Sequence, residues 1–416
     1  MSRRRQPHRI PPPISYGSEI LDSEIVLHEF PDDLGLYLWK SVRTVRLWGE
    51  VGDRRSHVFD PEAFARRITQ LRALPLDRDL RESLETAASI LGGDDVGLET
   101  IVTACRHIAS WAEARGALGT ALEFTQAAAL LQPGDAELVH SVAQLARRRG
   151  EYARAESWYR QAIATARRTH EWITLATAYL ELGRTFLQRG NLPAARQTLI
   201  RGVRAATRHS LWEERALLSH ELARLAMQTE RPAEVVRSGR AALEAYGADH
   251  PRLARLAADL GVFWVRSGYP REGARVLEAV DTSRLDPVER LERAAAFVRA
   301  AGASHQPEEV RAAWDDAMLA LEEPGVAREA APALLDLALG AAAAGELDLA
   351  RKAAERACRA AELRSDGTTR EAAEALLRAA RGEEPAPSLP SRRAPRELRS
   401  LADDLVAMLG SPAQAA

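Results

Sequence analysis

The amino-acid sequence predicts an all-α fold, a solenoid of stacked helical hairpins preceded by a small, mostly helical N-terminal cap. The composition is the first reason, because 46% of the residues are hydrophobic, only 5% are aromatic, and alanine is abundant. Small aliphatic residues suit closely packed helices, whereas a β-sandwich needs more β-branched and aromatic residues. The second reason is an internal repeat of about 34–40 residues that extends over residues 96–381.

Residues 1–18 form a basic, proline-rich tail with four arginines and the run Pro11–Pro13. Proline fixes φ and lacks a backbone donor, so we expect a flexible, extended segment. Such a tail can solubilise the chain or contact nucleic acid or an acidic partner. It lacks the apolar core of a secretory signal peptide.

Residues 19–95 form the predicted cap. Apolar residues recur at helical spacing from Leu34 to Val45, although residues 42–51 can also be interpreted as a short strand. Asp60 followed by Pro61 is typical of an N-cap and the first helical residue. The predicted helices after it cover about residues 61–74 and 77–91, ended by Pro75 and by Gly92–Gly93 respectively.

Residues 96–381 contain the repeat. The first small residue of the second helix in each hairpin stands at positions 121, 155, 195, 235, 273, 310 and 350, with separations of 34, 40, 40, 38, 37 and 40. A turn glycine precedes the second helix in the clearest units. The sixth unit has His305 instead of that glycine, and the fifth has Gly273 where alanine is usual. A single hairpin cannot bury its apolar face alone, so the units must stack.

One stretch carries the pattern most completely. It runs from Tyr179 through the pair Leu182-Gly183 to Phe186, and continues with Gly190, Ala195, Leu199 and Gly202. Residues 150–162 repeat its second half. The order of aromatic, Leu-Gly, aromatic, turn glycine and small residues resembles the tetratricopeptide repeat, in its bacterial form with longer units. The resemblance covers about seven repeats and implies a right-handed superhelix with a concave groove.

Two segments follow the array. Residues 382–395 hold four prolines and are predicted to be a linker. Residues 396–416 contain a short amphipathic helix and a tail, because Leu398, Leu401, Leu405 and Leu409 form one apolar stripe. We expect this helix to cap the open end of the solenoid, by folding back or by docking on another chain. Binding to a partner, including self-association, is the alternative.

The sequence holds no phosphate-binding loop, dinucleotide-binding motif, zinc-protease motif or nucleophile elbow. The two cysteines, Cys105 and Cys358, belong to no CxxC pair, so neither a disulfide framework nor a structural zinc site is expected. No apolar stretch is long enough for a transmembrane helix. The net charge of −2 gives no overall attraction to nucleic acid or anionic membranes. We therefore expect a cytoplasmic, non-enzymatic protein without cofactor or metal.

The resemblance also implies a binding groove lined by the first helix of each hairpin. The groove positions, carried over to this sequence, are Arg106, His140, Gln144, Arg147, Arg148, Arg184, Gln188, His220, Arg224 and Gln228. Arginines can grip an acidic segment through bidentate pairs. The alternative is that they pair with Glu181 and Glu221, which lie three residues before Arg184 and Arg224.

These observations predict a protein–protein interaction scaffold or adaptor, which binds a peptide or helix of a partner in the groove. The arginines make an acidic segment a candidate for that partner. The alternative is a partner- or peptide-sensing regulatory module of a bacterial signalling or transcription system. The lysine and asparagine set with which related arrays hold chaperone C-termini does not occur at the matching positions.

Overall fold

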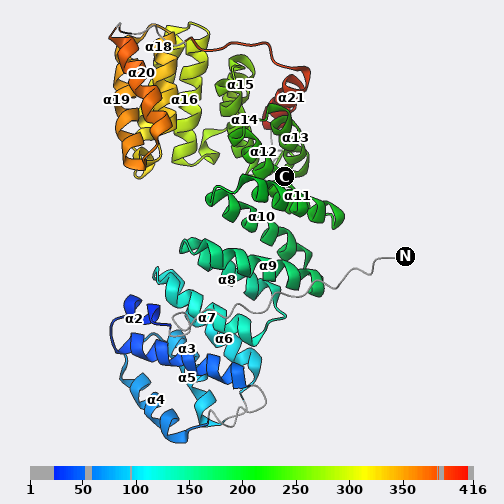
Figure 1. Ribbon diagram of the computed structural model, residues 1–416, viewed down its shortest axis with the longest axis vertical. Coiled ribbons are helices and arrows are strands. Elements are labelled where there is room, and N and C mark those ends of the chain that lie inside the picture. The colour runs from blue at the N-terminus through cyan, green and yellow to red at the C-terminus, as the bar shows by residue number, and fades with distance from the viewer. Residues whose placement is uncertain (1–22, 52–58, 94–95, 382, 384–387, 411–416) are drawn as a thin grey trace, which may run out of the picture. The chain divides into compact units, whose positions relative to one another are not determined.

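A computed structural model describes residues 23–51, 59–93, 96–381, 383 and 388–410, and these residues form helices and turns without a strand (Figure 1). The predicted tail 1–18 lies outside the described residues. The helical repeat solenoid is therefore confirmed as the fold. The chain divides into two compact units, residues 1–214 and 215–416. No helix of the described part is both long and apolar enough to cross a bilayer.

The first unit begins with the cap helices α2 (Ile25–Glu29), α3 (Asp33–Val51), α4 (Pro61–Ala73) and α5 (Arg78–Ser89), the last followed by the 3-10 turn η2 (Ile90–Gly92). The strand interpretation of residues 42–51 is wrong, because these residues continue α3. The N-cap prediction is confirmed, since the Asp60 carboxylate accepts a hydrogen bond from the Ala63 amide at 3.0 Å.

Three hairpins complete the first unit. They are α6 (Leu98–Ala114) with α7 (Leu118–Leu131), α8 (Ala136–Arg148) with α9 (Tyr152–Thr169), and α10 (Trp172–Gln188) with α11 (Leu192–Arg208). The cap is fastened to the first hairpin at the start of α7. There the Glu29 carboxylate accepts hydrogen bonds from the amides of Gly119 and Thr120 at 2.8 and 2.7 Å.

The second unit contains four hairpins. Its boundary at Arg215 lies within the first of their helices, α12 (Trp212–Gln228). The remaining helices are α13 (Pro232–Tyr246), α14 (Leu253–Arg266), α15 (Pro270–Glu278), α16 (Pro287–Ala303), α17 (Pro307–Leu321), α18 (Ala331–Ala343), α19 (Leu347–Arg364), α20 (Gly367–Ala380) and α21 (Arg396–Gly410), with 3-10 turns η3 (Thr282–Arg284) and η4 (Val326–Arg328). One apolar core joins α12–α15 to α21, and another joins α16–α20.

The repeat register predicted from the sequence agrees with the helices. Each of the seven marker residues is the fourth residue of its helix, and all seven are buried. The residue five places earlier has a left-handed backbone in every repeat, with φ from +51° to +87°. Glycine fills five of these turns, whereas Glu230 and His305 fill the other two. The missing glycine therefore leaves the turn geometry unchanged.

The unusual glycine of the fifth repeat has a packing reason. A Cβ atom added to Gly273 would lie 2.7 Å from the Gly261 carbonyl oxygen and 2.5 Å from Cγ2 of Val265. Helices α14 and α15 thus approach each other more closely than alanine allows.

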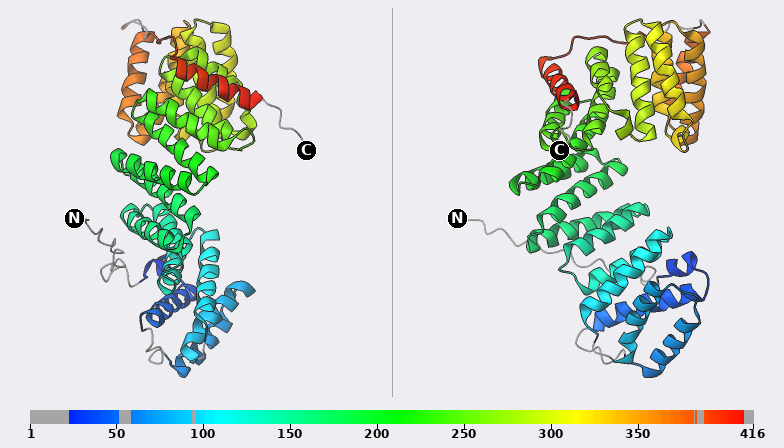
Figure 2. Two further views of the ribbon diagram at one scale, coloured as in Figure 1. Left: turned by 90° about the vertical axis from the view of Figure 1, so that its right-hand side faces the viewer. Right: turned by 180° about the vertical axis from the view of Figure 1, so that it is seen from behind.

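Helix α21 packs on α13, α14 and α15, and both views of Figure 2 show it beside these helices. Leu398, Leu401 and Leu405 are at most 2% exposed there, and Arg240 pairs with Asp404 at 2.7 Å. The expectation that this stripe covers the open end of the array is wrong. Helix α20, packed on α18 and α19, follows the last hairpin instead. The stripe is also covered within the chain, so self-association through it would first require α21 to detach.

Candidate functional site

In the first unit, two of the predicted groove arginines, Arg147 and Arg184, pair with the same glutamate. Glu181 on α10 pairs with Arg147 on α8 at 3.0 Å and with Arg184 at 2.8 Å. The Glu181 side chain is 10% exposed. On this face the arginines therefore pair with a glutamate of the same chain, which is the alternative to ligand binding given above. A ligand carboxylate would have to compete with a largely buried glutamate for both arginines.

His140, on the same face of α8, is only 7% exposed and its ring lies 5.5 Å from that of Tyr159. Burial lowers the pKa of His140 to about 4; the charge of Glu181 opposes this shift and the charge of Arg147 adds to it. The imidazole is thus neutral at pH 7 and belongs to the packing between α8 and α9.

The other predicted residues of the first unit lie nearer the surface. Gln144 is half-buried, whereas Gln188 and Arg106 are exposed. Arg148 forms an ion pair with Glu113 of the preceding first helix.

In the second unit, His220 on α12 is held from two sides. Its Nε2 lies 2.9 Å from Asp259 Oδ2 on α14, and its Nδ1 lies 3.3 Å from the Tyr246 hydroxyl. Burial alone would raise the pKa of Asp259, but the hydrogen bond and charge of His220, together with Arg224, lower it below the ordinary value. The Asp259 carboxylate is therefore ionised and keeps His220 oriented.

Arg224 is held more loosely than the arginines of the first unit. Its guanidinium lies 3.7 Å from both Glu221 and Asp259, and its side chain is 47% exposed. Distances of that length are outside good hydrogen-bond geometry. Arg224 can consequently turn toward a ligand without breaking a strong bond.

Arg224 and Gln228 line a pocket of about 600 Å³ in the second unit. Its apolar wall comes from Met227, Val262 and Phe263, and its polar wall includes Arg266, Glu292 and Arg392. Arg266 donates a hydrogen bond to Asp336 at 2.7 Å, while its Nη2 is buried without a partner in the described residues. Burial raises the pKa of Glu292. The pocket thus combines arginine donors with an apolar surface.

Sequence reasoning missed two arginines of this pocket, Arg266 and Arg392. Arg266 stands one repeat after Gln228, so extending the groove positions to the fifth repeat would have found it. Arg392 comes from the predicted linker and reaches the pocket because its amide donates a hydrogen bond to the Gly268 carbonyl at 2.7 Å. No local pattern indicates that contact.

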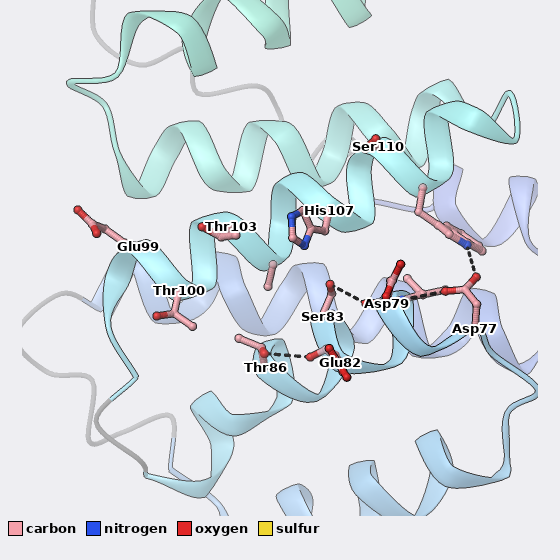
Figure 3. A pocket seen from close by; sticks show the side chains of 13 residues that line it. Asp77, Asp79, Glu82, Ser83, Thr86, Glu99, Thr100, Thr103, His107 and Ser110 are labelled. Atoms are coloured by element: carbon pink, nitrogen blue, oxygen red, sulfur yellow. Dashed lines mark hydrogen bonds between the residues drawn. The ribbon is translucent and has the colours of Figure 1, made fainter.

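A second pocket, of about 840 Å³, lies between α5 and α6 in the first unit (Figure 3). Asp79, Glu82 and Glu99 line it together with His107, and the Trp111 ring donates a hydrogen bond to Asp77 at 3.2 Å. The described residues contain no group of three or more histidine, cysteine or acidic side chains that could hold a metal ion.

Comparison with known proteins identifies the repeat. Residues 135–208, which span α8 to α11, match the model of the tetratricopeptide repeat family. The hairpins α8–α9 and α10–α11 are therefore tetratricopeptide repeats. No curated protein matches the sequence of this chain. The tetratricopeptide repeat is in general a non-enzymatic protein-interaction fold.

Solved structures resemble this chain at low sequence identity. A tetratricopeptide repeat protein from Parabacteroides merdae is 15% identical over 67% of this chain and 98% of its own, with a TM-score of 0.46. The Rap conjugation gene regulator of plasmid pLS20, solved with the Phr* peptide, is 14% identical over 79% and 98%, with a TM-score of 0.39. The APC/C hetero-tetramer Cut9-Hcn1 is 15% identical over 85% and 56%, also with a TM-score of 0.39.

Proposed function

We propose that this tetratricopeptide-repeat protein is a non-enzymatic scaffold that binds a peptide or helix of another protein on its first-helix face. The pocket of the second unit carries the proposal. It places the predicted groove residues Arg224 and Gln228 beside Met227, Val262 and Phe263. A preorganised concave surface of this kind lowers the entropic cost of capturing a flexible segment.

The pocket favours a segment that combines a carboxylate with an apolar side chain. The Arg224 guanidinium lies 3.7 Å from both Glu221 and Asp259, too far for a good hydrogen bond. A ligand carboxylate at hydrogen-bond distance would add a charged hydrogen bond of about 1.5–3 kcal/mol that Arg224 does not make with these two described residues. In the first unit, Glu181 already holds Arg147 and Arg184, so we expect the second unit to bind more tightly.

The test is affinity capture from the native lysate with the full chain and with the variant Arg224→Ala. Arg231→Ala is a matched control, because Arg231 is 53% exposed, pairs with Glu234 at 3.5 Å three residues away, and does not line the pocket. We expect a partner that the wild type and the control recover and that Arg224→Ala loses. Equal recovery of every partner by Arg224→Ala would refute binding in this pocket.

A further inference from the structure

The balanced charge of the whole chain hides one strongly basic segment. Residues 160–211 contain nine arginines and only two glutamates, a net charge of +7, while the full chain carries −2. Helix α11 has four arginines and no acidic residue. The absence of an overall attraction to polyanions therefore does not hold for this part of the first unit.

Three of the α11 arginines form one exposed row. Arg201, Arg204 and Arg208 lie three and four residues apart on the helix, so they share a face and extend along about 10 Å of its axis. Arg168 is exposed near the end of α9. None of these four forms an ion pair with another described residue, unlike Arg189, which pairs with Glu156 at 2.5 Å.

Aromatic rings lie at the end of this row. The rings of Trp172 and His209 stack with centroids 3.9 Å apart and planes inclined by 10°, and His170 meets Trp172 edge-on at 5.1 Å. The stack brings the turn after α9 next to the turn after α11. Close by in sequence, Ile173 and Trp212 are 61% and 59% exposed, which is unusual for such large apolar side chains.

We propose that this basic–aromatic patch, formed by Arg168, Arg201, Arg204, Arg208, Trp172, His209 and Trp212, binds single-stranded nucleic acid. Unpaired arginines contact phosphates, and exposed rings offer surfaces on which unpaired bases stack. Single-stranded nucleic acid uses both features together, because every nucleotide carries a phosphate for an arginine and a base that stacks on a ring. The patch combines arginines of second helices with rings at the end of α11 and at the starts of α10 and α12. It shares no residue with the pocket of the second unit proposed above for a protein partner.

The probe is a fluorescein-labelled 15-nucleotide oligo-dT, and the readout is anisotropy with the full chain at 50 to 200 mM salt. Four phosphate contacts predict a log–log slope near −2.8, and thus roughly a 50-fold loss of affinity over that range. The triple variant Arg201→Ala, Arg204→Ala and Arg208→Ala leaves one contact. The slope of the variant should be shallower, about −0.7, and its affinity should decrease only about threefold between 50 and 200 mM salt.

The aromatic part has a separate readout. Trp212→Ala should weaken binding roughly 5- to 150-fold without changing the salt slope, and Trp212→Phe should restore most of the affinity. The control variant Arg351→Ala, Arg356→Ala and Arg359→Ala removes three exposed arginines of α19, a helix that also carries acidic residues, and should leave binding unchanged.

Three results would overturn the proposal. They are no binding of the oligonucleotide by the wild type, an unchanged salt slope in the α11 triple variant, and binding of poly-glutamate with no binding of oligo-dT. The last result would assign the patch to an acidic protein. Equal affinity for a 15-base-pair duplex would also contradict the role of the rings. None of these results affects the lysate test, because that test depends on Arg224 and the pocket of the second unit.

Discussion

Glu29 fastens the N-terminal cap to the first hairpin, and its removal has a predictable cost. The residue before α7, Ala117, offers no side chain to cap the helix. The Glu29 carboxylate does so from a distance of ninety residues, accepting bonds from the amides of Gly119 and Thr120 and from the Thr120 hydroxyl at 2.7–2.8 Å. Both residues are buried, so water cannot easily replace the lost acceptor.

The magnitude follows from these bonds. Losing an N-cap costs about 0.5–2 kcal/mol, and losing one more hydrogen bond costs about 1 kcal/mol. We therefore expect Glu29→Ala to lower the free energy of opening at the start of α7 by about 1.5–3 kcal/mol. At 1.36 kcal/mol per factor of ten, this is roughly a 13- to 160-fold increase in amide exchange.

The assay is native-state hydrogen exchange of the Gly119 and Thr120 amides. Glu29→Gln keeps an acceptor oxygen and should have a smaller effect, whereas Glu24→Ala removes an exposed acid just before α2 and should have none. Unchanged protection of both amides in Glu29→Ala would refute the capping argument.

Three further predictions concern packing and protonation. Gly273→Ala should destabilise the second unit by about 1–3 kcal/mol, because the added Cβ atom clashes with Gly261 and Val265. The control Gly134→Ala has open space around its Cβ position and should shift Tm little. Equal Tm values for the two variants would contradict the close approach of α14 and α15. His140 has a folded-state pKa of about 4, below its unfolded value near 6.5, so its contribution to stability is complete above pH 6.5 and is lost as the pH falls toward 4. The variant His140→Phe should remove roughly 3 kcal/mol of that pH dependence in denaturant titrations at pH 7 and pH 4, and an unchanged pH slope would show that the imidazole is not the group responsible. Leu401→Ala should cost about 2–4 kcal/mol in the docking of α21 and speed proteolytic cleavage within residues 388–395, while the exposed Arg399→Ala should cleave at the wild-type rate.

The repeat was predictable because its signals are local. A buried residue at the fourth helical position and a left-handed turn five residues earlier both leave a mark within one hairpin, so the register could be determined even where Glu230 and His305 replace glycine. Both residues adopt the turn because the hairpin around them fixes it, at a cost that glycine would avoid.

The contacts that the sequence did not reveal join distant segments. Arg147 pairs with Glu181 from a neighbouring first helix, although only the pair Glu181–Arg184 has the spacing of helix neighbours. The apolar stripe of α21 correctly indicated a docked helix, but no local feature indicates that α13–α15 are its partners. His140 occupies a groove position in the pattern and is nevertheless buried, because Tyr159 of α9 packs beside it.

The docking of α21 also has a consequence during synthesis. Asp404 is 164 residues later in the chain than its partner Arg240. At about 5–20 residues per second, a ribosome needs roughly 8–33 s to make the residues between them. For the last part of that interval, roughly 6–24 s between the end of α15 at Glu278 and the start of α21 at Arg396, the apolar surface of α13–α15 exists without the helix that covers it. A nascent chain that pauses between α15 and α21 exposes this apolar surface to solvent. We therefore expect slow codons after α15 to increase aggregation and chaperone binding of this protein.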